Sequence, residues 1–399
     1  SSRLDMERIP EKGDNESDGR NDRRLCCGFP LSGLGDGSSS ENPSAQDCSV
    51  VSSAGIRKIA AAKRFHVPEF RLRDERSMRL GSVLTPLSDE NLQLAAQCGV
   101  TDIVQRYPGA DWRVLAERCR RIESFGMKCS VVEGYLPIEN IKLGRDDGSE
   151  VRALQELIRQ MADQDIRLLC YNFMAGTDWC RTVLDAPERG AAKVTAFRLA
   201  DVEQAVLLGY RPTDPQAEAD ARRLTPEDLW QQLERRRNQL LPVAEQCGVV
   251  LAMHPDDPPL SALLGKPRIM HSVEAFERLV RLVPSSANAI CFCQGSFASM
   301  NVDIPATIRR LGPWIRYVHF RDVRGTPQDF AETFHDNGPT DMVAAMRAYQ
   351  EIGFSGVMRP DHVPQLLGED DGEPGYTMLG RLFAWGYMRG LMQAVISGQ

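Results

Sequence analysis

The chain has 399 residues, a formal net charge of −7 and 11 cysteines. This acidic balance lacks the basic stripe with which nucleic-acid-binding proteins neutralise phosphates, and no segment approaches the ~20 consecutive apolar residues of a transmembrane helix. The cysteines are scattered and odd in number, which is typical of thiols in a reducing compartment rather than of a secreted disulfide framework. The sequence therefore favours a soluble cytoplasmic enzyme with neither nucleic-acid nor membrane partners.

Residues 1–77 differ in composition from the rest of the chain. The stretch Asp14–Ser53 is rich in Ser, Gly, Asp and Asn and poor in large apolar residues. Such a composition cannot bury enough surface to offset the entropy of the chain. We expect a low-complexity, disordered or irregular N-terminal extension, which is either a targeting or regulatory segment or a tail without function. A single catalytic domain over 78–399 would follow it.

From Met78 onward, short apolar runs alternate with longer amphipathic runs, which is typical of βα units around a parallel sheet. The eight predicted strands are Arg79–Leu84, Thr101–Gln105, Cys129–Glu133, Arg167–Phe173, Val249–His254, Ala289–Cys293, Arg316–Phe320 and Gly356–Arg359. The predicted helices are Asp89–Cys98, Trp112–Phe125, Glu150–Asp163, Pro226–Cys247, Val273–Val283, Ile304–Leu311, Asp341–Ile352 and Met378–Ile396. Eight strands that each precede a helix predict an α/β fold, the (β/α)8 TIM barrel.

The connection between the fourth strand and its helix is longer than a plain βα loop. It covers residues 174–223, and barrels accept insertions of this kind around the active site. The helix that follows has a clear start signal, with Thr225 as a suitable N-cap and Pro226 in the first helical position. We therefore expect this insertion to contribute to the active site.

Polar side chains stand at the carboxyl ends of the last four predicted strands. The strand VVLAMH ends in His254, AICFC in Cys293, IRYVH in His319, and GVMRPD in Asp361. In a barrel these ends converge on one pocket, at the face where barrel enzymes carry out their chemistry. Each residue alone would more often belong to the scaffold or the core, but four successive strand ends favour a divalent metal site. Two imidazoles, a thiolate and a carboxylate suit Mn, Fe, Co or Zn better than Mg or Ca.

The motifs around these residues resemble those of the mannonate dehydratase family. In chain order they are IKLG at 141–144, YNFM at 171–174, DWxRT at 178–182, HPDDPP at 254–259, CxGS at 293–296, HxR at 319–321, RPDH at 359–362, PGY at 374–376 and GRL at 380–382. HPDDPP and RPDH together make the resemblance specific, and the motifs cover most of the barrel. The resemblance implies a metal-dependent lyase that removes water from D-mannonate to give 2-keto-3-deoxy-D-gluconate in hexuronate breakdown.

The resemblance also implies a cofactor, Mn²⁺ or Fe²⁺, whose ligands in the family match the four strand-end residues. It implies an acid and a base at His362 and Tyr376, without assigning which residue is which. A bound metal would act as a Lewis acid on the proton at C2, while the acid donates to the departing C3 hydroxyl. A homodimer is what the family leads us to expect.

Further polar residues in these motifs are candidates for binding the sugar acid or for supporting the metal. The substrate candidates are Asn172, Arg181, Arg321 and Arg359. The arginines of the last two strands either clamp the substrate carboxylate by paired hydrogen bonds or pair with Asp322 and Asp361. The two carboxylates of HPDDPP, Asp256 and Asp257, are expected to orient His254 from behind.

The sequence departs from the family pattern at the first three strands. The first strand reads RLGSVL, without the Trp and Tyr of the family, and Gln105, Arg106 and Tyr107 follow the second, where the family has aromatic residues or His. Ile138 stands near the place of a family His, and the His-rich stretch after the seventh strand is reduced to His335. The substrate is therefore D-mannonate or a related sugar acid.

Two other readings compete with the dehydratase. One is a sugar isomerase or epimerase of the xylose-isomerase-like barrels, whose metal ligands are usually several Glu and Asp residues. Cys293 and the scarcity of strand-end Glu, of which Glu133 is the clearest, weigh against it. The other is an inactive barrel with a binding role, which predicts the loss of metal ligands that this chain retains.

Overall fold

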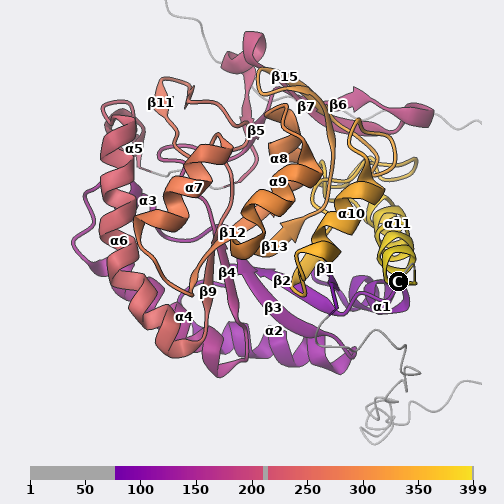
Figure 1. The fold of residues 1–399 in the computed structure, drawn as a ribbon, viewed down its shortest axis with the longest axis horizontal. Helices are drawn as coiled ribbons and strands as arrows, with labels where there is room; N and C mark the ends of the chain where they lie inside the picture. Colours follow the sequence, from indigo (N-terminus) through magenta and orange to yellow (C-terminus); the bar gives the residue numbers. More distant parts are fainter. Residues whose placement is uncertain (1–76, 210–213, 398–399) are drawn as a thin grey trace, which may run out of the picture. The chain divides into compact units, whose positions relative to one another are not determined.

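The structure is a computed structural model, which describes residues 77–209 and 214–397. Its centre is a closed barrel of parallel strands, with helices around it (Figure 1). In barrel order the strands are β1 (Arg79–Val83), β16 (Val357–Arg359), β13 (Ile315–His319), β12 (Asn288–Cys293), β9 (Val250–Met253), β4 (Leu168–Tyr171), β3 (Lys128–Glu133) and β2 (Asp102–Arg106). The predicted TIM barrel is confirmed, since every predicted strand overlaps one of these. The predicted N-terminal extension lies outside the described residues, except for Ser77.

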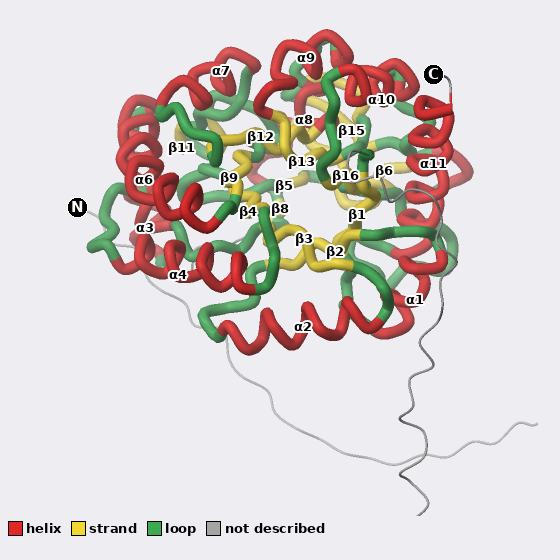
Figure 2. Tube along the Cα trace, turned by 60° about the horizontal axis from the view of Figure 1, so that its bottom comes forward, coloured by secondary structure: helices red, strands yellow, loops and turns green. Residues whose placement is uncertain are grey.

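The helices form a layer outside the strands, as Figure 2 shows. They are α1 (Asp89–Gln97), α2 (Trp112–Ser124), α3 (Glu139–Lys142), α4 (Ser149–Asp163), α5 (Pro215–Ala221), α6 (Pro226–Cys247), α7 (Val273–Leu282), α8 (Gln294–Ser299), α9 (Ile304–Leu311), α10 (Met342–Glu351) and α11 (Met378–Ser397), with 3-10 turns η1 (Arg189–Ala191), η2 (Leu199–Gln204) and η3 (Gly312–Trp314). All predicted helices are present. The short helices α3, α5 and α8 were not predicted, because so few residues carry no clear amphipathic period.

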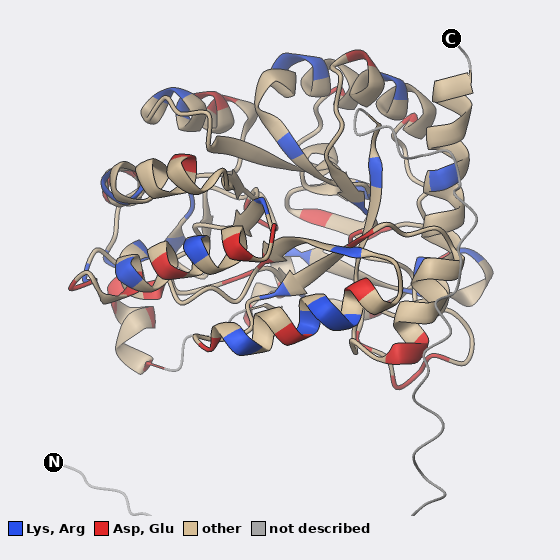
Figure 3. Ribbon diagram, turned by 90° about the horizontal axis from the view of Figure 1, so that it is seen from below, with Lys and Arg blue, Asp and Glu red and all other residues tan. Residues whose placement is uncertain are grey.

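The start of α6 follows the prediction from its capping residues. The Thr225 hydroxyl accepts from the Asp228 backbone N–H, the Asp228 carboxylate accepts from the Thr225 N–H, and Pro226 occupies the first turn. This reciprocal pair satisfies two backbone donors that would otherwise lack partners at the helix end. Charged residues of both signs lie along the outer helices (Figure 3). No helix in the described part of the chain is long and apolar enough to cross a membrane.

The long insertion folds into small sheets together with a second loop. Its strands are β5 (Cys180–Arg181), β6 (Val183–Pro187), β7 (Lys193–Arg198) and β8 (Val206–Leu207), and the loop after β13 supplies β14 (Val323–Thr326) and β15 (Asp329–Glu332). These strands make an antiparallel sheet in the order β14-β15-β7-β6 and a β5-β8 pair, while β10 (Ala262–Leu263) pairs with β11 (Lys266–Pro267). The pairing of β7 with β15 thus joins two loops far apart in the sequence (Figure 1).

The interior of the barrel is filled by side chains rather than open. A buried cluster takes one or more residues from each barrel strand: Val83, Val104, Val131, Leu168, Cys170, Ala252, Cys291, Tyr317 and Val357. Layers of inward-pointing side chains of this kind are the usual core of a TIM barrel. They form a floor, so the chemistry is confined to the carboxyl ends of the strands.

Candidate metal centre and active site

The four predicted metal ligands lie together at the carboxyl ends of the strands. One donor atom each from His254, Cys293, His319 and Asp361 lies within 4.8 Å of the others. These residues end or follow β9, β12, β13 and β16, which are successive neighbours in the barrel. Parallel strands therefore bring the four donors together, as the sequence predicts.

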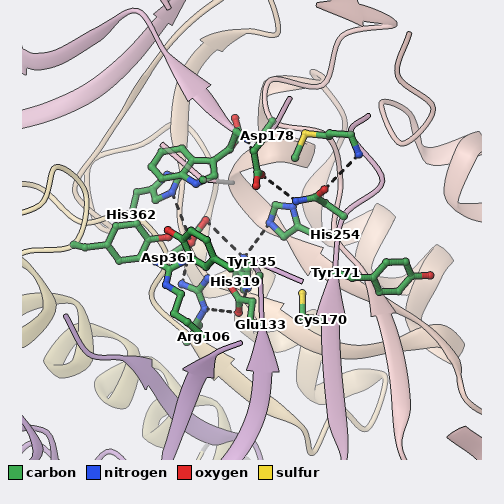
Figure 4. A pocket seen from close by; sticks show the side chains of 18 residues that line it. Arg106, Glu133, Tyr135, Cys170, Tyr171, Asp178, His254, His319, Asp361 and His362 are labelled. Atoms are coloured by element: carbon green, nitrogen blue, oxygen red, sulfur yellow. Dashed lines mark hydrogen bonds and ion pairs between the residues drawn. The ribbon is translucent and has the colours of Figure 1, made fainter. Parts of the chain in front are cut away.

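The two imidazoles are oriented so that one nitrogen of each faces the other across the cluster (Figure 4). His254 Nδ1 lies 2.7 Å from the Pro255 carbonyl oxygen, and His319 Nε2 lies 3.2 Å from Glu133 Oε2. Because both partners are acceptors, these ring nitrogens carry the protons. The remaining nitrogens, His254 Nε2 and His319 Nδ1, then face each other as acceptors at 3.2 Å. A cation between them satisfies both lone pairs, so the donor set fits a divalent metal.

The electrostatics of the cluster also favour a central positive charge. Burial opposes ionisation of the Cys293 thiol, but Arg321 and His254 hold its pKa well below the usual range. Burial likewise opposes a charge on His254, but the Cys293 thiolate raises the pKa of His254 to about 9. The Ser296 hydroxyl donates to Cys293 Sγ at 3.3 Å. A thiolate beside a site that attracts a proton is the electrostatic pattern expected of a metal ligand.

A second group of potential ligands lies below the first. Cys170, Cys291 and His319 also have donor atoms within 4.8 Å of one another. It shares His319 with the first group and contains no carboxylate. The first group is the better match for Mn²⁺ or Fe²⁺, which favour nitrogen and oxygen donors over paired thiolates.

Glu133 is a site residue whose role the sequence did not indicate. It ends β3, and besides His319 its carboxylate accepts from the Tyr317 hydroxyl at 2.6 Å and from Arg359 Nη2 at 2.5 Å. Burial opposes its charge, but Arg359 and His319 hold the pKa of Glu133 well below its usual range. Glu133 therefore fixes the orientation of His319. The available signal was its position as the clearest Glu at a strand end.

The structure contradicts the prediction that Asp256 and Asp257 orient His254. The Asp256 carboxylate accepts from the Met270 backbone N–H at 2.7 Å, and Asp257 pairs with two arginines instead. The orienting acceptor is the Pro255 carbonyl oxygen. The chain turns after His254, so a backbone group takes the place predicted for a carboxylate.

Arg321 lies beneath the site as part of a buried ion-pair network. Its guanidinium contacts Asp361 at 2.7 Å, Glu332 at 2.9 Å and Asp257 at 2.8 Å. It is 1% exposed and does not line the pocket beside the cluster. Of the two interpretations offered for Arg321, the structure shows the pairing with carboxylates: Asp361 is one of the two partners named, and Glu332 and Asp257 take the place of Asp322.

Arg181 has a similar place, and the structure does not bring it to the pocket wall where it was predicted to bind substrate. It lies in the insertion and pairs with Asp257 at 2.7 Å and with Glu332 at 2.6 Å. The side chain is fully buried and absent from the pocket lining. These two ion pairs hold the insertion to the loops at the end of the barrel.

The remaining predicted residues line a pocket beside the metal cluster. Arg359, which also pairs with Asp361 at 2.9 Å, and Asn172 both lie in its wall. The Asn172 amide donates to Asp178 at 3.0 Å and accepts from Lys142 at 3.2 Å. Asn172 therefore lies in the pocket wall with its amide held by Asp178 and Lys142.

His362 and Tyr376 lie next to each other in the same wall. The His362 ring stacks on Trp179 with centroids 4.4 Å apart and contacts the edge of Tyr376 at 5.5 Å. Its Nδ1 lies 2.9 Å from Glu332 Oε1, while Nε2 is 3.9 Å from Asp361, too far for a hydrogen bond. Burial, followed by the charge of Asp361, raises the pKa of the Tyr376 phenol.

The family model described as D-mannonate dehydratase (UxuA) matches residues 84–399 of the chain. The chain belongs to the D-mannonate dehydratase family. This family is one of hydro-lyases, so the predicted enzyme class and the resemblance are both confirmed.

Individual relatives agree with this family. The chain is 33% identical over 291 residues to a mannonate dehydratase from Oceanobacillus iheyensis, covering 69% of this chain and 83% of that protein. It is 33% identical over 336 residues to one from Streptococcus agalactiae serotype Ia, covering 78% and 96%. A solved mannonate dehydratase structure from Streptococcus suis serotype 2 matches with a TM-score of 0.73 and 30% identity, over 81% of this chain and 94% of that one.

The xylose-isomerase-like barrels are related to this chain in fold alone. A xylose isomerase domain protein from Alicyclobacillus acidocaldarius matches with a TM-score of 0.54 at 14% identity, over 80% of this chain and 100% of that chain. The L-ribulose 3-epimerase structure gives 0.52 at 15%, over 80% and 96%. These identities carry no argument for an isomerase or epimerase activity.

Proposed function

We propose that this protein is a metal-dependent hydro-lyase that converts D-mannonate into 2-keto-3-deoxy-D-gluconate and water. The observation that carries the proposal is the pair of imidazole nitrogens of His254 and His319, which face each other at 3.2 Å with Cys293 and Asp361 beside them. This donor set adjoins a pocket lined by His362 and Tyr376. Membership of the D-mannonate dehydratase family supplies the substrate class.

The metal in this proposal is Mn²⁺ or Fe²⁺, held by His254 Nε2, Cys293 Sγ, His319 Nδ1 and an Asp361 carboxylate oxygen. When bound, it supplies a Lewis acid that polarises the carboxylate of the sugar acid and makes the C2 proton more acidic. The chain's own contribution is to keep both imidazoles in the ligating orientation, through the Pro255 carbonyl and Glu133.

The proton transfers fall to His362 and Tyr376. Glu332 holds the Nδ1 side of His362, which leaves Nε2 as the acceptor for the C2 proton. The Tyr376 phenol, whose pKa burial raises, stays protonated and donates to the C3 hydroxyl, which leaves as water. The C2–H and C3–O bonds break, and the resulting enol gains a proton at C3 and loses the proton of its C2 hydroxyl to become the 2-keto acid.

The proposal extends to the surroundings of the enzyme. The described cysteines are all free thiols, which is consistent with a cytoplasmic enzyme. A homodimer is part of the same proposal, on the grounds of family membership alone.

Turnover of D-mannonate tests the proposal. The full chain is prepared without oxygen, stripped with a chelator and assayed for the 2-keto product with and without added Mn²⁺ or Fe²⁺. We expect product only with metal, and neither product nor tight metal binding in Cys293→Ala. The matched control is Cys119→Ala, a buried thiol on α2 that belongs to neither group of potential metal ligands. If the protein binds metal but turns over a different sugar acid, that acid replaces D-mannonate as the proposed substrate. If it neither binds metal nor forms product, the lyase proposal is rejected.

A further inference from the structure

The pocket contains an arginine that has no carboxylate partner among the residues that the structure describes. Arg106 ends β2 and lines the pocket together with Arg359. The neighbouring buried arginines Arg181, Arg321 and Arg359 each pair with two or more carboxylates. Within residues 77–209 and 214–397, the Arg106 guanidinium forms no ion pair and donates no hydrogen bond. Its N–H donors therefore remain available to a ligand in the pocket.

Two tyrosine rings hold this guanidinium in place. Arg106 Cζ lies 4.9 Å from the ring centroid of Tyr135 and 4.9 Å from that of Tyr376. Aromatic faces at this distance stabilise a cation, but they do not replace the carboxylate or phosphate that the planar donors of arginine match. The rings thus fix the position of the charge and leave its strongest interactions unmade.

The backbone at Tyr135 indicates that this arrangement is enforced. Tyr135 has φ +56°, a left-handed conformation that is uncommon for an aromatic residue, and it follows Gly134 at φ +71°. The Tyr135 side chain is 36% exposed, so burial of the ring does not account for this conformation. Strained residues of this kind gather at ligand sites. Here the left-handed turn at the end of β3 carries the ring to Arg106, at the wall of the pocket (Figure 4).

The nearest strand-end carboxylate is already committed elsewhere. Glu133 stands opposite Arg106 in the pairing of β2 with β3, but its oxygens are taken by Arg359, Tyr317 and His319. Asp361 is likewise taken by Arg321 and Arg359. An anionic ligand is therefore the group that completes the coordination of Arg106.

We propose that Arg106, held by Tyr135 and Tyr376, binds the carboxylate of the sugar acid and makes the pocket select acids over neutral polyols. This inference rests on the proposed function for the identity of the substrate. A carboxylate has two oxygens, so one can accept from Arg106 while the other remains available to a metal. Arg106 is a binding residue in this scheme and takes no part in the proton transfers.

The test compares Arg106→Gln and Arg106→Lys with the wild type, all metal-loaded. We expect Arg106→Gln to raise KM for D-mannonate about 10- to 100-fold, the range for loss of a charge-assisted hydrogen bond. The metal content should change little, and Arg106→Lys should recover part of the loss. The matched control is Arg113→Gln, which removes an exposed arginine on α2 whose ion pair in the described part of the chain is with exposed Asp111.

The neutral polyol D-mannitol separates charge recognition from a general loss of structure. As a competitive inhibitor it should bind wild type and Arg106→Gln equally, since it lacks the carboxylate. Equal weakening of D-mannitol and D-mannonate, an unchanged KM, or loss of metal from Arg106→Gln would each overturn the inference.

The failure of the proposed function gives a different result from the failure of this inference. If the wild type turns over no D-mannonate, calorimetric binding of D-mannonate and D-gluconate is compared with that of D-mannitol. A preference for the acids that Arg106→Gln abolishes supports the anion subsite without the lyase. No preference for either acid over the polyol rejects the subsite.

Discussion

Replacing Glu133 by Gln tests whether the metal centre depends on a residue that does not bind the metal. The substitution keeps the size of the side chain but removes the charge that accepts from His319 Nε2, Tyr317 and Arg359. Neutral Gln offers one acceptor oxygen in place of two, so it cannot hold both Arg359 and the His319 tautomer. Partners of this kind typically contribute 10- to 100-fold to metal affinity. We therefore expect the Kd for Mn²⁺ to rise by that factor, about 1.4–2.8 kcal/mol.

The stability of the metal-free protein should fall as well. Arg359 is 1% exposed, and loss of Glu133 leaves it with Asp361 as its remaining carboxylate partner among the described residues. Removing one partner of a buried pair usually costs about 3–5 kcal/mol, and the surviving Asp361 contact places the expectation near the lower end.

Two measurements separate these effects on Glu133→Gln. Competition with a chelator of known affinity gives the Kd for Mn²⁺, and urea unfolding of the metal-free protein gives its stability. The control is Glu117→Gln on the exposed face of α2, which should change neither quantity. A folded Glu133→Gln protein with wild-type affinity for Mn²⁺ would refute the claim that Glu133 orients His319.

Four further outcomes follow from the structure. His362→Gln should lower kcat about 10²- to 10⁴-fold, with Mn²⁺ content and KM near wild type in metal analysis and steady-state assays. Thr225→Ala removes the cap of α6 and should lower the free energy of unfolding by about 1 kcal/mol in urea. Mn²⁺ should raise Tm in a concentration-dependent way, and excess chelator should reverse the shift. Burial lowers the pKa of His335 to about 4, whereas an unfolded His protonates near pH 6.5. The unfolded state therefore binds the additional proton, and the free energy of unfolding should decrease as the pH is lowered from about 6.5 to 4, by up to ~1.4 kcal/mol per pH unit. Urea unfolding of His335→Gln across that range should lack this decrease.

The barrel and the metal ligands were predictable because both depend on local patterns. Alternating apolar runs set the strands, and a cap such as Thr225 sets a helix start within a few residues. His254 and Cys293 each stand at a strand end, and parallel topology alone brings such ends together. No long-range contact had to be known in advance.

The partners of the buried arginines could not be predicted in the same way. Glu332 reaches Arg181 and His362 because β15 pairs with β7, and these strands belong to loops more than a hundred residues apart. Nothing in either loop specifies that pairing. Asp257 is oriented by Arg181 and Arg321, which are distant in the sequence. Because these contacts could not be predicted, Asp257 was expected to orient its sequence neighbour His254.

Strand β3 connects the two halves of the site. Glu133, its last residue, orients His319 at the metal cluster, and Tyr135, two residues later, covers Arg106 in the pocket. Gly134 and Tyr135, both with left-handed backbone, directly follow Glu133 and direct the chain toward Arg106. Substitutions of the two residues should therefore affect different measurements. Loss of the Glu133 charge weakens metal binding, whereas loss of the Arg106 charge weakens binding of the sugar acid and leaves the metal in place. An Arg106→Gln protein that lost metal as readily as Glu133→Gln would mean that the two halves are one network, and that the pocket charge acts through the metal rather than on the substrate.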